Sequence, residues 1–343
     1  MKRLALILAL LCALPILRAG TVDEDWKALV ALDAGPSGEP KTQEEARERA
    51  LGHLGKQVRA LRDFLAAHAA DERAFEARLR LSRALQIRAD FTGEERLRAE
   101  AKKLLDEMDR TAAPAQRAEV DFAKIAALMR ALSQPTREQR EELLAAARKF
   151  QGDHPDDRRL AALLAEVAAL FDMQPSTKLA LLEDALPLAK DAELKSRIAD
   201  DLKRVRLFGR TFPLAGPTLQ GRKADIEQLR GKPVLVVIFA DFSPPSTAAL
   251  VSVQRAVAEI GAGSVQVLCV NLDSKRETAT GLLREMNVTW PVIFDGKGWQ
   301  SPTVRDLGIN ALPTVWLLDA KGRLRSLNAL EGTAAQVRQL LKE

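Results

Sequence analysis

The second half of the chain alternates between short runs of branched apolar residues and amphipathic segments. The apolar runs, rich in Val, Ile and Leu, have the length of buried strands and occupy residues 234–239, 265–272, 291–294 and 313–318. Helical patterns lie between and after them, at residues 246–261, 275–286, 301–307 and 333–342. Strands that alternate with helices predict an α/β sheet with parallel strands at its centre. Residues 324–327, which follow a short turn, are expected to form a hairpin with the strand before them.

The first half has a different composition. It is rich in Ala, Leu, Arg and Glu, poor in Gly and β-branched residues, and spaces its apolar residues as a helix does. Prolines 20 to 21 residues apart, as expected at the joints between successive helices, stand at Pro114, Pro135, Pro155 and Pro175. We therefore expect two domains, an all-α domain over residues 21–206 and an α/β domain over residues 207–343.

One pattern of the helical half occurs twice, at an offset of 86 residues. The two copies have phenylalanine, histidine and aspartate in register, as Phe64, His68 and Asp71 and as Phe150, His154 and Asp157. In each copy a helix ends in an aromatic residue, and a turn leads into a new amphipathic helix. This order loosely resembles the tetratricopeptide-like repeats of envelope proteins. That resemblance implies a concave surface that binds peptides or proteins. The alternative is a helical bundle without repeats.

The first twenty residues are predicted to be a secretory signal. Lys2 and Arg3 precede an apolar run, residues 4–17, that is too short to span a bilayer, and Ala19 provides a tolerable cleavage site. We expect an exported protein of the periplasm or cell envelope. The alternative is an uncleaved membrane anchor, which is the only lipid contact that we expect.

Charge and cysteine content narrow the function classes. Residues 1–19 contain three basic residues and no acid, which leaves 49 basic against 47 acidic residues in the remainder. This balance argues against nucleic acid as a partner. Past the signal the chain has one cysteine, Cys269, so it cannot form an internal disulfide, and its three histidines are far apart. We therefore expect neither a metal site nor a cofactor.

Four segments of the second half, in order, resemble the TlpA/ResA-like branch of the thioredoxin fold, a redoxin family. They are an opening hairpin within residues 209–232, a strand and turn at 234–246, a helix and strand within 273–295, and a proline-led strand within 308–322. The resemblance covers all of residues 207–343 and implies a thioredoxin-like fold. Fold alone does not define function.

The same resemblance implies a Cys-x-x-Cys pair at the turn, where this chain reads Ser243-Pro244-Pro245-Ser246. Two serines cannot exchange disulfides, so we treat Ser243 and Ser246 as degenerate catalytic positions. A serine nucleophile needs a base, and no histidine occurs in residues 207–343. Serine and proline are favoured at a helix start, so we expect Ser243 to be the N-cap and Pro244 the first helical residue.

Two further positions agree with a loss of redox chemistry. Thioredoxins proper place a buried acid six residues before the first cysteine, and the corresponding residue here is Val237. Cys269 lies within an apolar run, where we expect a small buried side chain with a raised pKa rather than a reactive thiol.

The remaining expectation concerns a groove. Leu312-Pro313 matches the family's cis-proline element, next to which the backbone pairs with an extended substrate segment. We therefore expect a peptide-binding site made of Phe242, Pro244, Pro245, Leu312 and Pro313. The alternative is that Pro313 serves only the geometry of the sheet.

Taken together, these features predict a non-enzymatic protein-binding or scaffold module of the cell envelope, whose partner is a protein or an extended peptide. The alternative is a thiol–disulfide oxidoreductase of the TlpA/ResA type, or a redoxin-type antioxidant protein, that acts through another sulfur.

Overall fold

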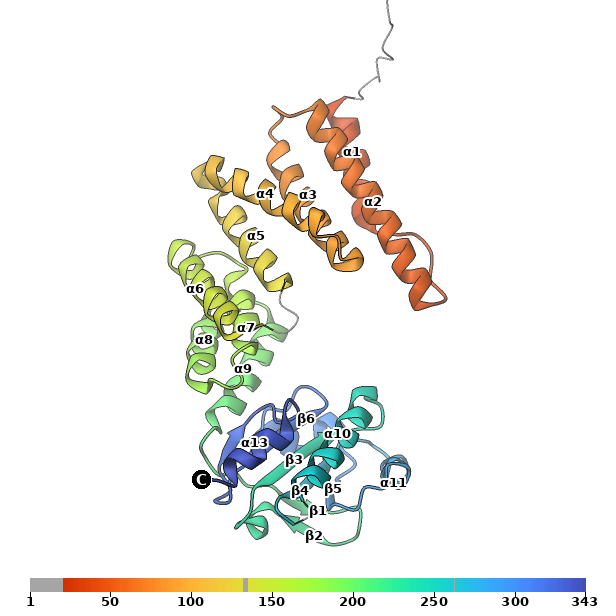
Figure 1. Ribbon diagram of the computed structural model, residues 1–343, viewed down its shortest axis with the longest axis vertical. Coiled ribbons are helices and arrows are strands. Elements are labelled where there is room, and N and C mark those ends of the chain that lie inside the picture. The colour runs from red at the N-terminus through yellow and green to blue at the C-terminus, as the bar shows by residue number, and fades with distance from the viewer. Residues whose placement is uncertain (1–20, 132–134, 262) are drawn as a thin grey trace, which may run out of the picture. The chain divides into compact units, whose positions relative to one another are not determined.

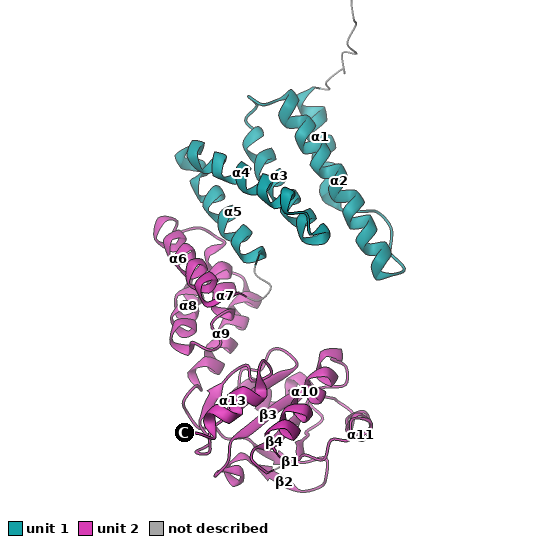
Figure 2. Ribbon diagram, in the orientation of Figure 1, with its two compact units in different colours: residues 1–134 teal, residues 135–343 magenta. Residues whose placement is uncertain are grey.

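The computed structural model describes residues 21–131, 135–261 and 263–343. It falls into two compact units, residues 1–134 and residues 135–343 (Figure 2). The predicted signal at residues 1–20 lies outside the described part. Within the described part, no helix is long and apolar enough to cross a membrane.

The first unit is helical. Thr21 and Thr42 start its first two α-helices, each accepting a hydrogen bond from the backbone amide three residues further on. Buried side chains of α2 and α3, Leu61, Phe64 and Leu85 among them, form its core. Its elements are α1 (Val22–Ala31), η1 (Leu32–Ala34), α2 (Gln43–Ala67), α3 (Ala74–Thr92), α4 (Glu95–Thr111), η2 (Pro114–Gln116) and α5 (Arg117–Arg130) (Figure 1).

The second unit begins with four further helices, α6 (Arg137–Asp153), α7 (Leu160–Ala169), α8 (Pro175–Leu188) and α9 (Ala192–Arg206). The prolines stand at the joints, as predicted. Pro114 and Pro175 are the first residues of their helices, Pro135 comes just before α6, and Pro155 lies between α6 and α7. The predicted helical character of residues 21–206 is therefore confirmed.

The two sequence copies fold into the same turn. The amide of His68 donates to the Phe64 carbonyl over 2.8 Å and the amide of Asp71 to the His68 carbonyl over 3.1 Å; the second copy has the same two bonds at 2.8 and 3.1 Å. In both, the histidine ring packs on the phenylalanine, with ring centroids 5.1 and 4.9 Å apart. The aspartate pairs with the arginine two residues later in each copy. The repeat is thus one of structure as well as of sequence.

The remainder of the second unit is a five-stranded sheet with the strand order β5-β4-β3-β6-β7. An antiparallel hairpin, β1 (Ala215–Pro217) and β2 (Lys223–Asp225), precedes it. The sheet strands are β3 (Val234–Phe239), β4 (Gln266–Asn271), β5 (Val292–Ile293), β6 (Thr314–Leu318) and β7 (Leu324–Ser326). All six side chains of β3 are buried, as its central place requires.

The prediction of parallel strands holds for β3, β4 and β5 only. β6 pairs antiparallel with β3, and β7 antiparallel with β6. The link from β5 to β6 contains a single α-helix, α12 (Pro302–Asp306). An antiparallel β6 starts at the end of the sheet where β5 finishes, so this link makes no crossover to the opposite end of the sheet.

Helices cover both faces of the sheet. On one face lie α10 (Pro244–Ile260), α11 (Arg276–Glu285) and α13 (Thr333–Leu340) (Figure 1). Their buried apolar side chains share a core cluster with Leu235, Val237 and Phe239 of β3. The opposite face of β3 packs against α12 and against residues around the opening hairpin. Each fully buried Val or Leu of such a strand is worth about 1.5–3 kcal/mol, so β3 anchors the core.

The last helix of the helical region is attached to the sheet domain. The Arg204 guanidinium of α9 donates to the carbonyl of Gly308 and to Asn310 Oδ1 at 2.6 Å, and it also pairs with Asp201. The side-chain Nδ2 of Asn310 donates to Asp201 Oδ1 over 3.2 Å. The last helix of this region ends at Arg206 and the first strand begins at Ala215, whereas the compact units divide between residues 134 and 135.

Candidate functional site

The Ser-Pro-Pro-Ser turn lies at the carboxyl end of β3, and Ser243 occupies the N-cap position of α10. Its side chain makes no capping hydrogen bond, contrary to expectation. The reason is local: Pro244 and Pro245 have no amide hydrogen, and the amide of Ser246 already donates to the Ser243 carbonyl over 2.8 Å. The half-buried hydroxyl of Ser243 is therefore left free of the helix.

Ser246 has a different environment. Its side chain is fully buried, and its Oγ accepts a hydrogen bond from the amide of Ala240 over 3.3 Å. That bond joins the first turn of α10 to the end of β3. Ser246 thus holds the turn together from inside, while Ser243, Pro244 and Pro245 lie at or near the surface.

A buried carboxylate beside the turn was missed by the sequence analysis. Asp273, which is 4% exposed, lies just past the end of β4. It accepts hydrogen bonds from the Asp241 amide at 3.0 and 3.2 Å and from Asn271 Nδ2 at 2.7 Å. The sequence does contain a pattern that could have indicated it: Asn271 and Asp273 are two residues apart at the carboxyl end of a predicted parallel strand. Ligand-binding sites of α/β sheets lie at such strand ends. The carboxylate fixes the backbone that leads into the turn.

The proline loop reaches the same end of the sheet. The Leu312–Pro313 peptide bond is cis, and Thr314, the first residue of β6, lies opposite Ile238 near the carboxyl end of β3. The Leu312 side chain is half-buried and packs against the core that contains Phe212 and Trp316. Within the described residues, the Leu312 amide donates no hydrogen bond.

Two exposed aromatic residues flank this end. Phe242, one of the residues predicted to bind a peptide, is 55% exposed and lies in the turn. Trp299, which is 42% exposed, was not predicted; it lies in η4 (Gly298–Gln300), after β5. A Cβ on Gly298 would approach the Leu272 carbonyl to 3.2 Å, so η4 lies against the end of β4. Only the sheet topology places Trp299 at the same end as the turn.

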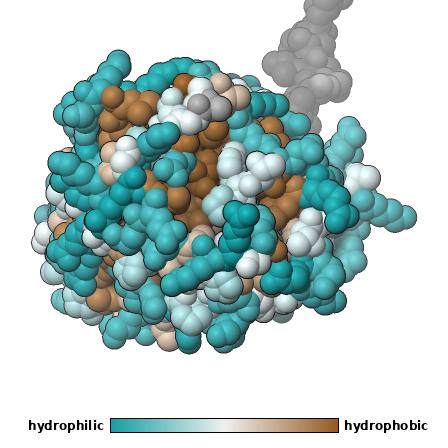
Figure 3. Space-filling model, turned by 90° about the horizontal axis from the view of Figure 1, so that it is seen from below, coloured by the Kyte–Doolittle hydropathy of each residue, from teal (hydrophilic) through white to brown (hydrophobic). Residues whose placement is uncertain are grey.

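Few large apolar side chains are exposed among the residues that the structure describes. On the face in Figure 3, polar side chains predominate and apolar ones appear between them. The large apolar side chains that are exposed in the described ranges are Val30, Phe91, Met173, Phe242, Trp299 and Leu341. Phe242 and Trp299 are the two at the carboxyl ends of the sheet strands.

Cys269 is in the middle of β4, opposite Val237 of β3 and Val292 of β5. It is fully buried, and burial raises the pKa of its thiol far above the ordinary value. The expectation of a small, buried side chain with a raised pKa is confirmed. The histidines are also in structural roles: His53 bonds to the Leu32 carbonyl at 2.7 Å and His68 to Asp25 at 2.8 Å, while His154 stacks on Phe150.

These features define the class of the second domain. A central β3 between parallel β4 and antiparallel β6, an opening hairpin, a turn entering a helix and a cis-proline before β6 make it a thioredoxin-like domain. Residues 201–341 match the family model described as Redoxin.

Individual proteins with similarity cover the same part of the chain. The thioredoxin-like protein YneN of Bacillus subtilis (strain 168) is 24% identical over 127 residues, which are 36% of this chain and 72% of YneN. The C-terminal domain of a putative thiol-disulfide oxidoreductase from Bacteroides thetaiotaomicron is 15% identical, with a TM-score of 0.37, over 39% of this chain and 96% of that one. A putative thiol:disulfide interchange protein DsbE from Chlorobium tepidum is 23% identical, with a TM-score of 0.35, over 38% and 94%.

Proposed function

We propose that this chain is an exported thioredoxin-like protein without a redox dithiol, and that its sheet domain binds an extended protein segment rather than exchanging disulfides. The observation that carries the proposal is the pair of hydroxyls at Ser243 and Ser246, one half-buried and one fully buried. Disulfide exchange requires a thiolate, and the domain's one thiol, Cys269, is buried with a raised pKa.

The binding role is supported by what surrounds the turn. The cis Leu312–Pro313 bond, the unpaired Leu312 amide and the exposed Phe242 and Trp299 lie at one end of the sheet. An extended segment could bond to the Leu312 backbone and place apolar side chains on the two aromatic rings. A protein or extended peptide of the cell envelope is therefore the proposed partner, and residues 1–20 support export.

An insulin-reduction assay tests the chemistry. We expect no disulfide reductase activity in the unmodified protein or in Cys269→Ala. The double variant Ser243→Cys/Ser246→Cys restores a dithiol at the helix start and is expected to gain activity. The alternative, an oxidoreductase or antioxidant protein that uses another sulfur, draws support from the Redoxin match. Activity of the unmodified protein that disappears in Cys269→Ala would establish that alternative.

Site-specific crosslinking tests the binding. A photoreactive phenylalanine analogue at Phe242 is expected to crosslink a partner in envelope extract, and Trp299→Ser in the same chain is expected to reduce the yield severalfold. The matched control carries the analogue at Leu341, which is similarly exposed but lies at the end of α13. Equal adducts from both positions would argue against a specific groove. N-terminal sequencing of the envelope-associated protein tests cleavage after Ala19.

A further inference from the structure

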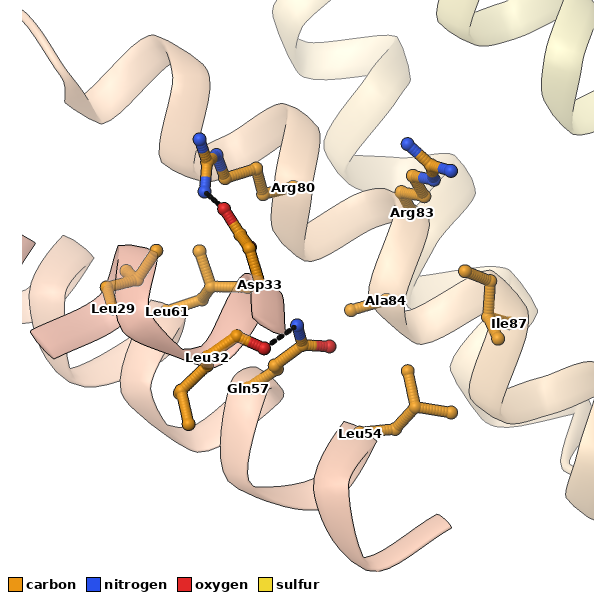
Figure 4. A pocket seen from close by; sticks show the side chains of 10 residues that line it. All are labelled: Leu29, Leu32, Asp33, Leu54, Gln57, Leu61, Arg80, Arg83, Ala84 and Ile87. Carbon is orange, nitrogen blue, oxygen red and sulfur yellow. Dashed lines mark hydrogen bonds and ion pairs between the residues drawn. The ribbon is translucent and has the colours of Figure 1, made fainter. Parts of the chain in front are cut away.

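The first helical unit contains a cavity that is separate from the thioredoxin-like site. It lies between the end of α1, η1, α2 and α3 and has a volume of about 460 Å³ (Figure 4). Its apolar walls include the buried side chains of Leu29, Leu54, Leu61 and Ala84, with the half-buried Ile87 at one side. A volume of this size is within the range of small-ligand pockets, roughly 300–1,000 Å³.

One polar group in the cavity lacks a partner. The Leu32 carbonyl accepts hydrogen bonds from His53 Nε2 at 2.7 Å and Gln57 Nε2 at 3.2 Å, which fastens η1 to α2. The second of these bonds uses the side-chain amide nitrogen of Gln57. Within the described residues its Oε1 accepts no hydrogen bond, and it points toward the side of Ala84 and Ile87 (Figure 4). The cavity therefore presents a free acceptor to a ligand that carries an N–H group.

Of the two arginines that line the cavity, one is paired with carboxylates of described residues and the other is not. Arg80 pairs with Asp33 at 2.7 Å and with Glu76 at 2.9 Å, and it lies over the Trp26 ring at 5.2 Å. Arg83 is exposed at the rim and makes no ion pair with any described residue. The cavity thus has one uncompensated positive charge at its edge, which favours an anionic ligand.

The second copy of the repeated turn shows that the helical hairpin does not require this lining. At the offset of 86 residues, Leu143 stands where the first copy has Gln57, and Leu143 is fully buried. Ala169 replaces Arg83, and Leu170 replaces the smaller Ala84. The free acceptor, the free cation and the small wall residue therefore belong to the first copy alone.

We infer that this cavity binds an acidic peptide segment. An aliphatic side chain of the segment fills the space between Leu54, Leu61 and Ala84, a backbone N–H donates to Gln57 Oε1, and a neighbouring carboxylate pairs with Arg83. A fatty acid could pack its chain on the apolar walls and pair its carboxylate with Arg83, but it has no N–H group to donate to Gln57 Oε1. The inference depends on no property of the Ser-Pro-Pro-Ser turn or of the groove beside it.

Fluorescence anisotropy of the full chain with a labelled peptide that has Glu-Leu-Glu at its centre tests the inference. We expect saturable binding below about 1 mM, the weak end of specific recognition. Arg83→Glu is expected to weaken binding at least tenfold and to improve binding of a Lys-Leu-Lys peptide. Ala84→Leu, which copies the residue of the second hairpin, is expected to abolish binding by filling the cavity. Far-UV circular dichroism confirms that each variant is folded.

Two controls separate this site from other surfaces. Arg59→Glu reverses an exposed charge on the neighbouring helix α2, at a residue that does not line the cavity. It is expected to leave the affinity within twofold. Phe242→Ser alters the thioredoxin-like groove and is expected to have no effect on this peptide. The inference is overturned if no saturable binding occurs, if Arg83→Glu binds as well as the unmodified chain, or if hexadecanoate binds in the cavity while the peptide does not.

Discussion

At the scale of single residues, the two serines of the turn differ in what holds them. Ser246 is buried and accepts a hydrogen bond from Ala240, whereas the hydroxyl of Ser243 is half-buried and caps nothing. A serine pair in place of a dithiol therefore preserves the structure of the turn through Ser246. Asp273 supports the turn from β4 through the amide of Asp241. The acceptors of these two hydrogen bonds are oxygen atoms, of the Ser246 hydroxyl and of the Asp273 carboxylate. The turn therefore keeps its structure without a thiolate.

Thiol labelling checks the burial of Cys269. In the chain without residues 1–20, we expect the native protein to react negligibly with a thiol reagent such as Ellman's reagent, because burial raises the pKa and blocks access. One thiol should become reactive on unfolding in urea. Ser243→Cys provides the control, since a half-buried cysteine at a helix start is expected to react in the native state. Fast labelling of native unmodified protein would contradict the structure.

At the scale of elements, the contact of α9 with the loop before the cis-proline depends on a glycine. Gly308 has a φ of 67°, and a Cβ there would lie 2.4 Å from the Asp200 carbonyl oxygen and 3.0 Å from Lys203 Cβ. Backbone oxygen cannot move away without moving α9. The glycine is therefore required both by its left-handed conformation and by the close approach of the helix.

Gly308→Ala is expected to lower the free energy of unfolding by about 2–4 kcal/mol, the sum of left-handed strain and a clash. Gly209→Ala is the matched control: its φ is 74°, but nothing lies within 4 Å of an added Cβ. It should cost about 1–2 kcal/mol from conformation alone. Urea unfolding followed by tryptophan fluorescence measures both, and equal losses would show that α9 does not press on the loop.

The β6–β7 hairpin contains a buried carboxylate with a pH-dependent contribution. Burial alone would raise the pKa of Asp319, but hydrogen bonds from Arg323 and from the Lys321 amide hold the pKa below its ordinary value. A lowered pKa means that the stabilisation is present above the unfolded pKa, about 3.9, and is lost as pH falls through the folded value.

Asp319→Asn is therefore expected to lower stability by about 1.5–3 kcal/mol at neutral pH, the value of hydrogen bonds to a charged group. The difference between the two proteins should shrink as pH falls below about 4. Urea unfolding at several pH values measures it. A difference that stays constant down to pH 2 would mean that the aspartate charge is not responsible.

At the scale of the whole molecule, the compact units do not follow the change in secondary structure. α6–α9 group with the thioredoxin-like domain, and Arg204, Gly308 and Asn310 form part of the attachment. The predicted domain boundary between residues 206 and 207 coincides with the end of α9. That residues 207–343 are a domain that is stable without the preceding helices remains a prediction, which truncation can test.

Two fragments make that comparison. Residues 135–343 keep the bonds of Arg204, and residues 207–343 lose them. Hydrogen bonds to a charged group are worth about 1.5–3 kcal/mol, and each 1 kcal/mol shifts the melting temperature of a domain of this size by about 2–4 °C. We expect the shorter fragment to melt at least about 3 °C lower by differential scanning calorimetry. Equal melting temperatures would place the boundary of stability at residue 207.

Local patterns in the sequence determined much of this protein. Apolar runs and helical spacing located β3, β4, β6 and the helices between them, because side-chain periodicity depends only on near neighbours. The repeated turn and the absence of a dithiol could also be read directly, since each is a matter of residue identity.

The tertiary structure alone decided which residues meet. Asp273 and Trp299 join the turn because the carboxyl ends of β3, β4 and β5 share one edge of the sheet, a relation that depends on strand order rather than on spacing. The missing cap of Ser243 depends on the bond that Ser246 makes, and the free acceptor of Gln57 on where η1 packs. Proximity between segments distant in the chain comes from packing, which local patterns do not encode.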